Sequence, residues 1–258
     1  MRIFDYLKQG QGLTSKAAKS ALKQDLVQVD GQLVTYPSFI VDPGWQEISL
    51  AGIDITDRQL AHHHYILNKP AGYLSASRDE KWPVALDLIT NSHQLKLSLV
   101  GRLDKDTRGL LLATNNGQLH YLLEQARFHV EKTYLVKVNG PLNEADCQAF
   151  SQGIIFTSGF VCQPAVLEIV TTTRQVSQAY VTITEGQRHQ VKKMFLARGL
   201  RVIDLQRLRM GPLDLGAVPL AEGSFRPLLA DEVNQLKLLM NDPLRRRNYE
   251  SDTNKRAD

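Results

Sequence analysis

The fold of this chain is decided by the stretch GRLDKDTRG at residues 101–109, which the apolar run LLLA at residues 110–113 follows. An apolar run of this length, closed by the turn dipeptide Asn116-Gly117, predicts a strand covered on both faces, so the loop before it is held by the core. Two carboxylates and three basic groups lie within seven positions of that loop. This composition suits a site that needs one ionised carboxylate beside a polyanion. The residues alone leave an ordinary solvated, charge-mixed turn open as well.

Length and composition allow two domains. With 258 residues, of which 43% are apolar, the chain can bury a sizeable core, and we expect a small domain followed by a larger one. The formal net charge of +4 permits an anionic partner without requiring one. Two cysteines, Cys147 and Cys162, imply neither a disulfide scaffold nor a zinc site, so a reduced compartment is expected. No apolar run is long enough to span a bilayer, which predicts a soluble, cytoplasmic protein without a membrane partner.

The first thirty-four residues form a unit with its own pattern. A short helix is expected to open at Arg2, and a second helix starts in the turn at residues 12–15 and continues to Leu22. Residues 27–34 predict a hairpin with an Asp-Gly turn. Three lysines share one face of the second helix, where they can meet phosphate groups or simply solvent. They are Lys16, Lys19 and Lys23.

A domain boundary is expected near residues 58–64. It gives a first domain at residues 1–59 and a second domain at residues 62–240. The tail at residues 241–258 is basic and polar with little that is apolar, and it is expected to be disordered.

The run His62-His63-His64 lies at this boundary. Three consecutive residues cannot all point at one ion from a strand, and no cysteine or carboxylate partners them nearby in the sequence. We therefore interpret the run as linker and expect no metal site. Beyond it, residues 65–69 predict a strand that ends in a turn at Pro70 and Gly72.

Later segments add further candidate residues. Residues 132–138 alternate as a strand with Tyr134 on one face. Another strand leads into the helical stretch 191–198, whose apolar residues fall on a single side. Arg188 and Lys192 lie one turn apart on a different side. A cation there can pair with a buried carboxylate or hold a phosphate.

Five segments resemble known families. Residues 101–117 resemble the catalytic-aspartate motif of the pseudouridine synthases, in the branch that contains RsuA. The strand that ends in Asn68-Lys69-Pro70, the strand with Lys132-x-Tyr134, and the stretch from Glu185 to Phe195 resemble other motifs of the same family. Residues 2–34, with the strands that follow, resemble an S4 domain, a small RNA-binding module.

The resemblance implies catalytic roles. It places the indispensable catalytic aspartate of the family on Asp104 and leaves Asp106 as a bystander. The tyrosine that stacks on the target uracil is carried to Tyr134, because a flipped pyrimidine needs an aromatic face. The basic residue that forms a salt bridge to the aspartate is carried to Lys192. Arg102 is placed to fill the gap that the flipped base leaves.

The chain departs from the family pattern at a few positions. Gln187 stands where a basic residue is expected after Glu-Gly, with Arg188 one place later. In the S4-like part, Lys16 stands where arginine is usual. Such a module supplies position and salt-dependent affinity but no base identity. The candidate RNA-backbone contacts are Arg188, Lys193, Lys16, Lys19 and Lys23, and His189 is interpreted as a surface or backbone contact.

The implied reaction is the isomerisation of a uridine in RNA to pseudouridine. The glycosidic bond to nitrogen is broken, the base turns, and a glycosidic bond to carbon forms. No redox change, cofactor or metal is needed, and the sequence contains no P-loop or dinucleotide fingerprint. Asp104 must be ionised to act, and a cation at Lys192 favours that form. Whether the carboxylate attacks the sugar or the base stays open at this point.

The resemblance also implies a fold and a partner. We expect an α+β protein, with a small S4-like RNA-binding domain followed by a mixed, largely antiparallel sheet that forms the catalytic domain. Similarity to RsuA favours 16S rRNA, free or in a partly assembled small subunit, as the partner of a monomeric enzyme. Large-subunit 23S rRNA is the alternative target within the family.

Two functions from other classes remain as rivals. The loop at Asp104 is nearly the acid-x-acid-x-Thr loop of magnesium-dependent phosphohydrolases, but Thr107 falls one residue early. The other rival is a non-catalytic protein whose whole function is RNA binding by the S4-like unit. The joint presence of Asp104, Tyr134 and Lys192 in their motifs argues against it.

Overall fold

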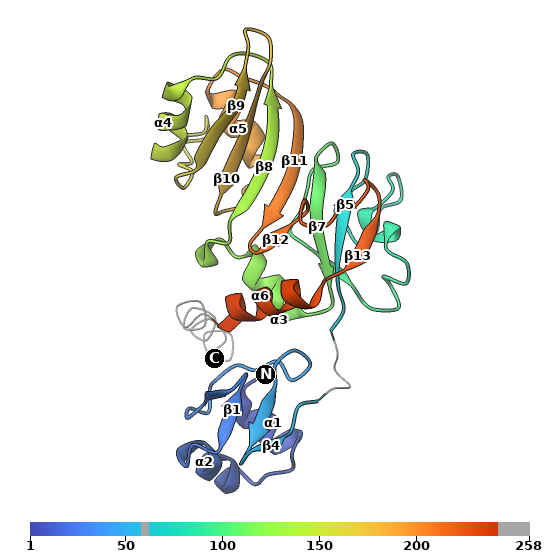
Figure 1. Cartoon of the computed structure of the whole chain (residues 1–258), viewed down its shortest axis with the longest axis vertical. Coiled ribbons are helices and arrows are strands. Elements are labelled where there is room, and N and C mark those ends of the chain that lie inside the picture. Colours follow the sequence, from blue (N-terminus) through green and yellow to red (C-terminus); the bar gives the residue numbers. More distant parts are fainter. Residues whose placement is uncertain (58–61, 242–258) are drawn as a thin grey trace. The chain divides into compact units, whose positions relative to one another are not determined.

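The computed structural model describes residues 1–57 and 62–241 and divides the chain into two compact units (Figure 1). One unit holds Met1–His62 with the end of the last helix from Asn234, and the other holds His63–Val233. Both units combine helices with a sheet, so the predicted α+β class is confirmed. The expected disordered tail lies, apart from its first residue, outside the described residues. The same is true of residues 58–61 at the expected boundary.

The first unit packs two helices against a small antiparallel sheet. Its helices α1 (Ile3–Gln9) and α2 (Ser15–Lys23) match the two predicted ones. Thr14 caps α2 because its side chain accepts a hydrogen bond from the backbone N–H of Ala17 at 3.2 Å. The strand order is β2-β1-β3-β4, and the strands are β1 (Val27–Val29), β2 (Gln32–Leu33), β3 (Ile48–Leu50) and β4 (Ile53–Asp54).

The turn between β1 and β2 is the predicted Asp-Gly hairpin. Asp30 and Gly31 have positive φ angles of 49° and 76°, as a tight two-residue hairpin turn requires. The Asp30 carboxylate also accepts hydrogen bonds from the backbone N–H of Glu47 and the side-chain amide of Gln46, both at 2.9 Å. These bonds tie the turn to the segment that enters β3. The inner face of α2 is buried at Ala18, Ala21 and Leu22.

The second unit is built on a mixed sheet with the order β13-β5-β7-β11-β8-β10-β9. Neighbouring strands are antiparallel, except that β7 and β11 are parallel. β6 pairs with β7, and β12 pairs with β11. The strands are β5 (His64–Lys69), β6 (Ser98–Val100), β7 (Arg108–Thr114), β8 (Lys132–Val138), β9 (Val166–Thr172), β10 (Ser177–Ile183), β11 (Val202–Met210), β12 (Leu213–Asp214) and β13 (Phe225–Pro227).

Helices connect and cover these strands (Figure 1). Phe150 on one helix and Phe195 on another are fully buried, with ring centroids 4.9 Å apart. Both belong to a continuous apolar cluster with Tyr134, Val136 and Val138, the predicted inner face of β8. The helical segments of the unit are η2 (Ala85–Leu88), α3 (Gly117–Glu124), η3 (Ala126–Phe128), α4 (Glu144–Gln152), α5 (Gln190–Ala197) and the start of α6 (Ala230–Asn241).

Strand β7 is covered on both faces, as its apolar run predicts. Leu110, Leu111, Leu112 and Ala113 are all 0% exposed. The loop at residues 101–107 connects β6 to this strand, so both of its ends are fixed in the core.

The parallel contact between β7 and β11 joins the two halves of the sheet. It covers two residue pairs, one of them Arg207 opposite Gly109. A Cβ atom at Gly109 would lie 2.2 Å from the carbonyl oxygen of Arg207, and its φ is 104°, so glycine is required here. Buried Arg207 donates from Nε to the carbonyl of Leu110 at 2.8 Å. Arg108 on β7 forms an ion pair with Asp204 on β11 at 2.8 Å.

Two sequence predictions are corrected. Asn116 is not part of a simple turn but caps α3, because its side chain accepts from the backbone N–H groups of Gln118 and Leu119 at 2.9 Å. The linker interpretation of the histidine run is wrong at His64, which begins β5 and hydrogen-bonds Thr114 at 2.8 Å. Because β5 pairs with the buried strand β7, its first residue, His64, is not solvated as a linker residue would be.

The substitution Gly109→Ala should weaken the contact between β7 and β11. The added methyl group meets backbone atoms that cannot move aside, and the positive φ adds strain, so we expect a loss of about 2 to 4 kcal/mol of stability. Thermal unfolding of the purified protein measures it. Gly117→Ala is the control, since a Cβ there meets nothing within 4 Å. Equal melting temperatures for the two variants would contradict the assignment.

Candidate active site

Asp104 lies in the loop between β6 and β7, with its carboxylate between two basic groups. The ammonium of Lys192, on α5, is 2.8 Å from Oδ2, and Nε2 of His189 is 3.4 Å from Oδ1. The Asp104 side chain is 28% exposed, so solvent or a substrate can reach it. The ion pair that the resemblance assigned to Lys192 and Asp104 is therefore formed. His189 is an additional neighbour that the sequence reading treated as a surface contact.

Asp106 shares the same ammonium. Nζ of Lys192 is 2.6 Å from its Oδ1, and its side chain is 74% exposed. Burial lowers the pKa of Lys192, but the hydrogen bonds to the two carboxylates outweigh this effect and raise it. Burial likewise raises the pKa of Asp106, but the hydrogen bond and the charge of Lys192, together with smaller contributions, outweigh this effect and lower the pKa. Asp106 is thus a second anion of the cluster, and an ammonium fills the space between the two carboxylates.

A turn before α5 positions His189 and Lys192. Glu185 is buried and accepts hydrogen bonds from the side chain of Gln190 at 2.7 Å and from the backbone N–H of Gln163 at 3.0 Å. His189 precedes the helix in a left-handed conformation, with φ 55°. Because α5 begins only at Gln190, Arg188 lies outside the helix. The predicted one-turn spacing between Arg188 and Lys192 is therefore wrong.

The buried ammonium of Lys69 fixes the backbone of the Asp104 loop. Lys69, at the end of β5, is 0% exposed. Its Nζ donates to the carbonyl oxygens of Thr107 at 2.8 Å, Pro70 at 3.0 Å and Asp104 at 3.2 Å, with that of Lys105 at 3.4 Å. Burial lowers the pKa of Lys69 to about 8, although the charges of the two nearby aspartates oppose this shift.

Other contacts hold the loop along its length. The hydroxyl of Ser75 accepts from the N–H of Leu103 at 3.1 Å and donates to its carbonyl at 3.0 Å. The carboxylate of Glu124 accepts from the N–H of Gly101 at 2.9 Å. The N–H of Gly72 donates to the carbonyl of Lys105 at 2.7 Å. The Asp104 carboxylate therefore projects from a backbone that is fixed before and after it.

Tyr134 lies on β8 and is 7% exposed. Its ring belongs to the apolar cluster that also includes Leu103 and Val191, the chain neighbours of Asp104 and Lys192. The cluster therefore links the three residues for which the resemblance implies catalytic roles. Nearly all of the ring surface is buried against protein.

The remaining predicted RNA contacts are exposed. Arg102, two residues before Asp104, forms no hydrogen bond or ion pair with any residue that the structure describes. Lys193 lies 5.5 Å from the ring centroid of Phe156. Arg188 and the three lysines of α2 are also exposed, so all of these charges are accessible to a polyanion. The α2 residues are Lys16, Lys19 and Lys23.

Two features are absent from the part of the chain that the structure describes. Among residues 1–57 and 62–241, no group of three or more histidine, cysteine, aspartate or glutamate side chains is arranged to hold a metal ion. Within the same part of the chain, no helix combines the length and the apolar character that crossing a membrane requires.

Sequence reasoning missed two residues of the site. Lys69 ends a strand that lies beside the buried β7, and a lysine at such a position must find several acceptors. The pairing of this strand with β7 is seen only in the structure, so the role of Lys69 had no local mark in the sequence. His189 falls three residues before Lys192, but the left-handed turn that directs it at Asp104 has no clear mark in the sequence.

Comparison with known proteins supports one family. A family model described as RNA pseudouridylate synthase matches residues 63–197, and a model of the S4 domain matches residues 1–45. The chain is 35% identical to the ribosomal small subunit pseudouridine synthase A of Escherichia coli strain K12 over 90% of this chain and 98% of that protein. It is 33% identical to the protein of the same name from Haemophilus influenzae, over 92% of this chain and 99% of the other.

Two further similarities agree with this result. An uncharacterized RNA pseudouridine synthase of Bacillus subtilis strain 168, YtzG, is 35% identical over 94% of this chain and 99% of its own length. A crystal structure of a pseudouridylate synthase superposes with a TM-score of 0.62 at 31% identity, covering 92% of this chain and 99% of that chain.

Activity should fall as the pH rises through about 8, the value to which burial lowers the pKa of Lys69. The neutral amine has two N–H groups in place of three, so one loop carbonyl loses its donor. Stability should change in the opposite direction: between about 8 and the ordinary value of 10.5, the unfolded chain binds more protons, so the unfolding free energy from this group rises with pH. The pH profiles of activity and of denaturant unfolding measure both.

Two variants control this prediction. Lys69→Met should lose roughly 100-fold in activity and lack the decline near pH 8. Lys132→Met is the matched control, because burial also lowers the pKa of Lys132 to about 8 but its ammonium donates to the carbonyl of Val130. Its profile should keep the decline. If Lys69→Met keeps the decline and Lys132→Met loses it, the assignment to Lys69 is wrong.

Because Asp104 and Asp106 share the ammonium of Lys192, we expect substitutions at Lys192 and at Asp106 to reduce activity to different extents. Lys192→Met removes the cation nearest to Asp104, and we expect activity to fall by roughly 100-fold or more. Asp106→Asn removes an exposed partner that contributes at most about 1 kcal/mol, so activity should fall by less than about fivefold. Steady-state kinetics of the two variants test this difference. A larger loss in Asp106→Asn than in Lys192→Met would reverse the roles of the two residues.

Proposed function

The chain belongs to the RNA pseudouridylate synthase family, and on that premise we propose that it isomerises one specific uridine of small-subunit 16S rRNA to pseudouridine. The choice of 16S rRNA is supported by the two relatives above that are named ribosomal small subunit pseudouridine synthase A. The observation that carries the assignment of the site is the Asp104 carboxylate, partly open to solvent and 2.8 Å from Lys192 on a loop fixed by Lys69.

The proposed chemistry uses the ionised carboxylate of Asp104. The bond between N1 of uracil and C1′ of ribose breaks, the base turns, and a bond between C5 and C1′ forms. The hydrogen on C5 leaves as a proton, and N1 takes up a proton in its place. Atoms and electrons balance without an oxidant or reductant. The ammonium of Lys192 and the ring of His189 keep the carboxylate oriented toward the substrate. The carboxylate of Asp104 is the attacking group whether the attack is on C1′ of the sugar or on the base.

The substrate uridine must leave its stack to reach Asp104, which costs roughly a few kcal/mol. We assign the contact with the flipped uracil to Tyr134, which shares an apolar cluster with the neighbours of Asp104 and Lys192. Arg102 takes the space that the base leaves. Its exposed guanidinium, two residues from Asp104 and without a partner among the described residues, suits that role.

The S4 domain supplies binding that does not depend on sequence. Its lysines on α2 are exposed and meet the phosphate backbone, so affinity should fall with rising salt concentration. In the second unit, Arg188 and Lys193 contact the phosphate backbone as well. In this proposal the enzyme works as a monomer in the cytoplasm, on 16S rRNA or a partly assembled small subunit. The contacting lysines are Lys16, Lys19 and Lys23.

Pseudouridine mapping of rRNA tests the proposal. Cells that lack the protein should lose one pseudouridine of 16S rRNA. A copy of the wild-type gene should restore it, and a copy with Asp104→Asn should not, because the amide carries no negative charge. Arg209→Gln is the control, since this residue is exposed and pairs only with Asp214 among the described residues.

Each other outcome removes a defined part of the proposal. Loss of a site in 23S rRNA would keep the reaction and reject the small-subunit target. An unchanged map would reject rRNA as the substrate. Full restoration by Asp104→Asn would reject the catalytic role of Asp104.

A further inference from the structure

The segment between β5 and β6 carries an exposed tryptophan near the active-site loop. Trp82 is 44% exposed, whereas Trp45, the other tryptophan of the chain, is 6% exposed. Tryptophan is a large aromatic side chain, and an exposed one leaves apolar surface that a bound base can cover.

Local hydrogen bonds fix the backbone at Trp82. The Asp79 carboxylate accepts from the N–H groups of Lys81 at 2.9 Å and Trp82 at 2.8 Å. Directly after Trp82, the chain returns to the core, where Leu74 exchanges hydrogen bonds with the carbonyl of Pro83 at 2.9 Å and the N–H of Ala85 at 2.8 Å. The indole is therefore presented by a closed loop.

Contacts with the Asp104 loop place the indole beside the active site. The ammonium of Lys105 lies directly over the Trp82 ring. Lys105 is the next residue after Asp104, and its carbonyl is held by Gly72. At the base of the segment, Ser75 binds the backbone of Leu103. Trp82 is thus one lysine side chain away from the proposed catalytic carboxylate.

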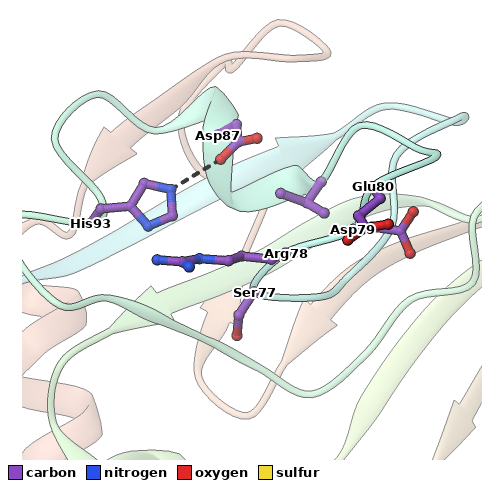
Figure 2. A pocket seen from close by; sticks show the side chains of 7 residues that line it. Ser77, Arg78, Asp79, Glu80, Asp87 and His93 are labelled. Carbon is purple, nitrogen blue, oxygen red and sulfur yellow. Dashed lines mark hydrogen bonds and ion pairs between the residues drawn. The ribbon is translucent and has the colours of Figure 1, made fainter.

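The charged groups near Trp82 determine whether a phosphate or a base of RNA can bind there. A cavity of about 590 Å³ in the same segment is lined by the carboxylates of Asp79, Glu80 and Asp87, against the single guanidinium of Arg78. Figure 2 shows Asp87 paired with His93, at 3.2 Å. Three carboxylates repel phosphate groups, so the cavity itself disfavours the RNA backbone.

An uncharged nucleobase, in contrast, can stack on an indole beside these carboxylates. Base stacking on aromatic rings tolerates every sequence. The ammonium groups of Lys81 and Lys105 both lie near the ring. That of Lys81 is 5.5 Å from the ring centroid. They can neutralise the phosphates that flank the stacked base.

We propose that Trp82 is an RNA-binding residue that stacks on a base next to the flipped uridine, with Lys105 holding the adjacent phosphate. This inference rests on the proposed function and names a contact with its substrate. Stacking on a neighbouring base is made equally before and during the reaction, so it affects binding more than chemistry. It also positions the strand so that the target uridine lies over Asp104.

Steady-state kinetics on a 16S rRNA transcript test the proposal. Trp82→Ala should raise KM about tenfold with little change in kcat, a difference of about 1.4 kcal/mol. Trp82→Phe should keep most of the affinity, because it keeps an aromatic face. Tyr180→Ala is the matched control. Tyr180 is also exposed, at 38%, but neighbouring Val181 lies opposite Tyr134 in the sheet, so Tyr180 lies on the other face. A wild-type KM for Trp82→Ala, or a loss confined to kcat, would overturn the proposal.

Fluorescence provides a readout that does not need turnover. The emission of the wild type minus that of Trp82→Phe belongs to Trp82, and adding the transcript should quench it. An unchanged difference at saturating RNA would overturn the proposal. If the wild type binds and quenches but forms no pseudouridine, the proposed function has failed while the stacking contact stands. If pseudouridine forms without quenching, the proposed function stands and the stacking contact is rejected.

Discussion

The site depends on one buried charge. The ammonium of Lys69 is fully enclosed and is bound by the carbonyl oxygens of Asp104 itself and of Thr107 after it. Burying an unpaired charge is very costly, so the loop must keep its carbonyls around this ammonium whenever the domain is folded. The direction of the Asp104 side chain is fixed as a result, and Lys192, 88 residues further along the chain, meets it at 2.8 Å. A carboxylate on a freely moving loop would not hold that geometry.

The sheet carries this arrangement from two sides. Strands β5 and β7 bring Lys69 and the Asp104 loop, while β10 leads into α5 with Lys192. The parallel contact between β7 and β11 joins these halves, and Gly109 permits it because no side chain fits there. The position of the candidate catalytic groups is therefore a consequence of the sheet topology.

Much of the fold follows from local patterns in the sequence. The buried run after Gly109, the alternation around Tyr134 and the Asp30-Gly31 hairpin each depend on a few adjacent residues, and their predictions hold. Contacts between distant segments could not be derived in this way. The pair of Lys192 and Asp104 was expected from family resemblance alone, and the roles of Lys69 and His189 depend on backbone geometry. The burial of Lys69 comes from strand pairing, and the direction of His189 from a left-handed turn.

The most direct test of the central claim is tritium release from RNA labelled at C5 of uridine. Formation of the bond between C5 and C1′ expels that hydrogen, so release reports the reaction itself. With purified protein and a 16S rRNA transcript, the wild type should release tritium in proportion to one uridine per RNA, and Asp104→Asn should release none while binding the transcript with unchanged affinity. Release by Asp104→Asn at the wild-type rate would contradict the assignment of the reaction to this carboxylate.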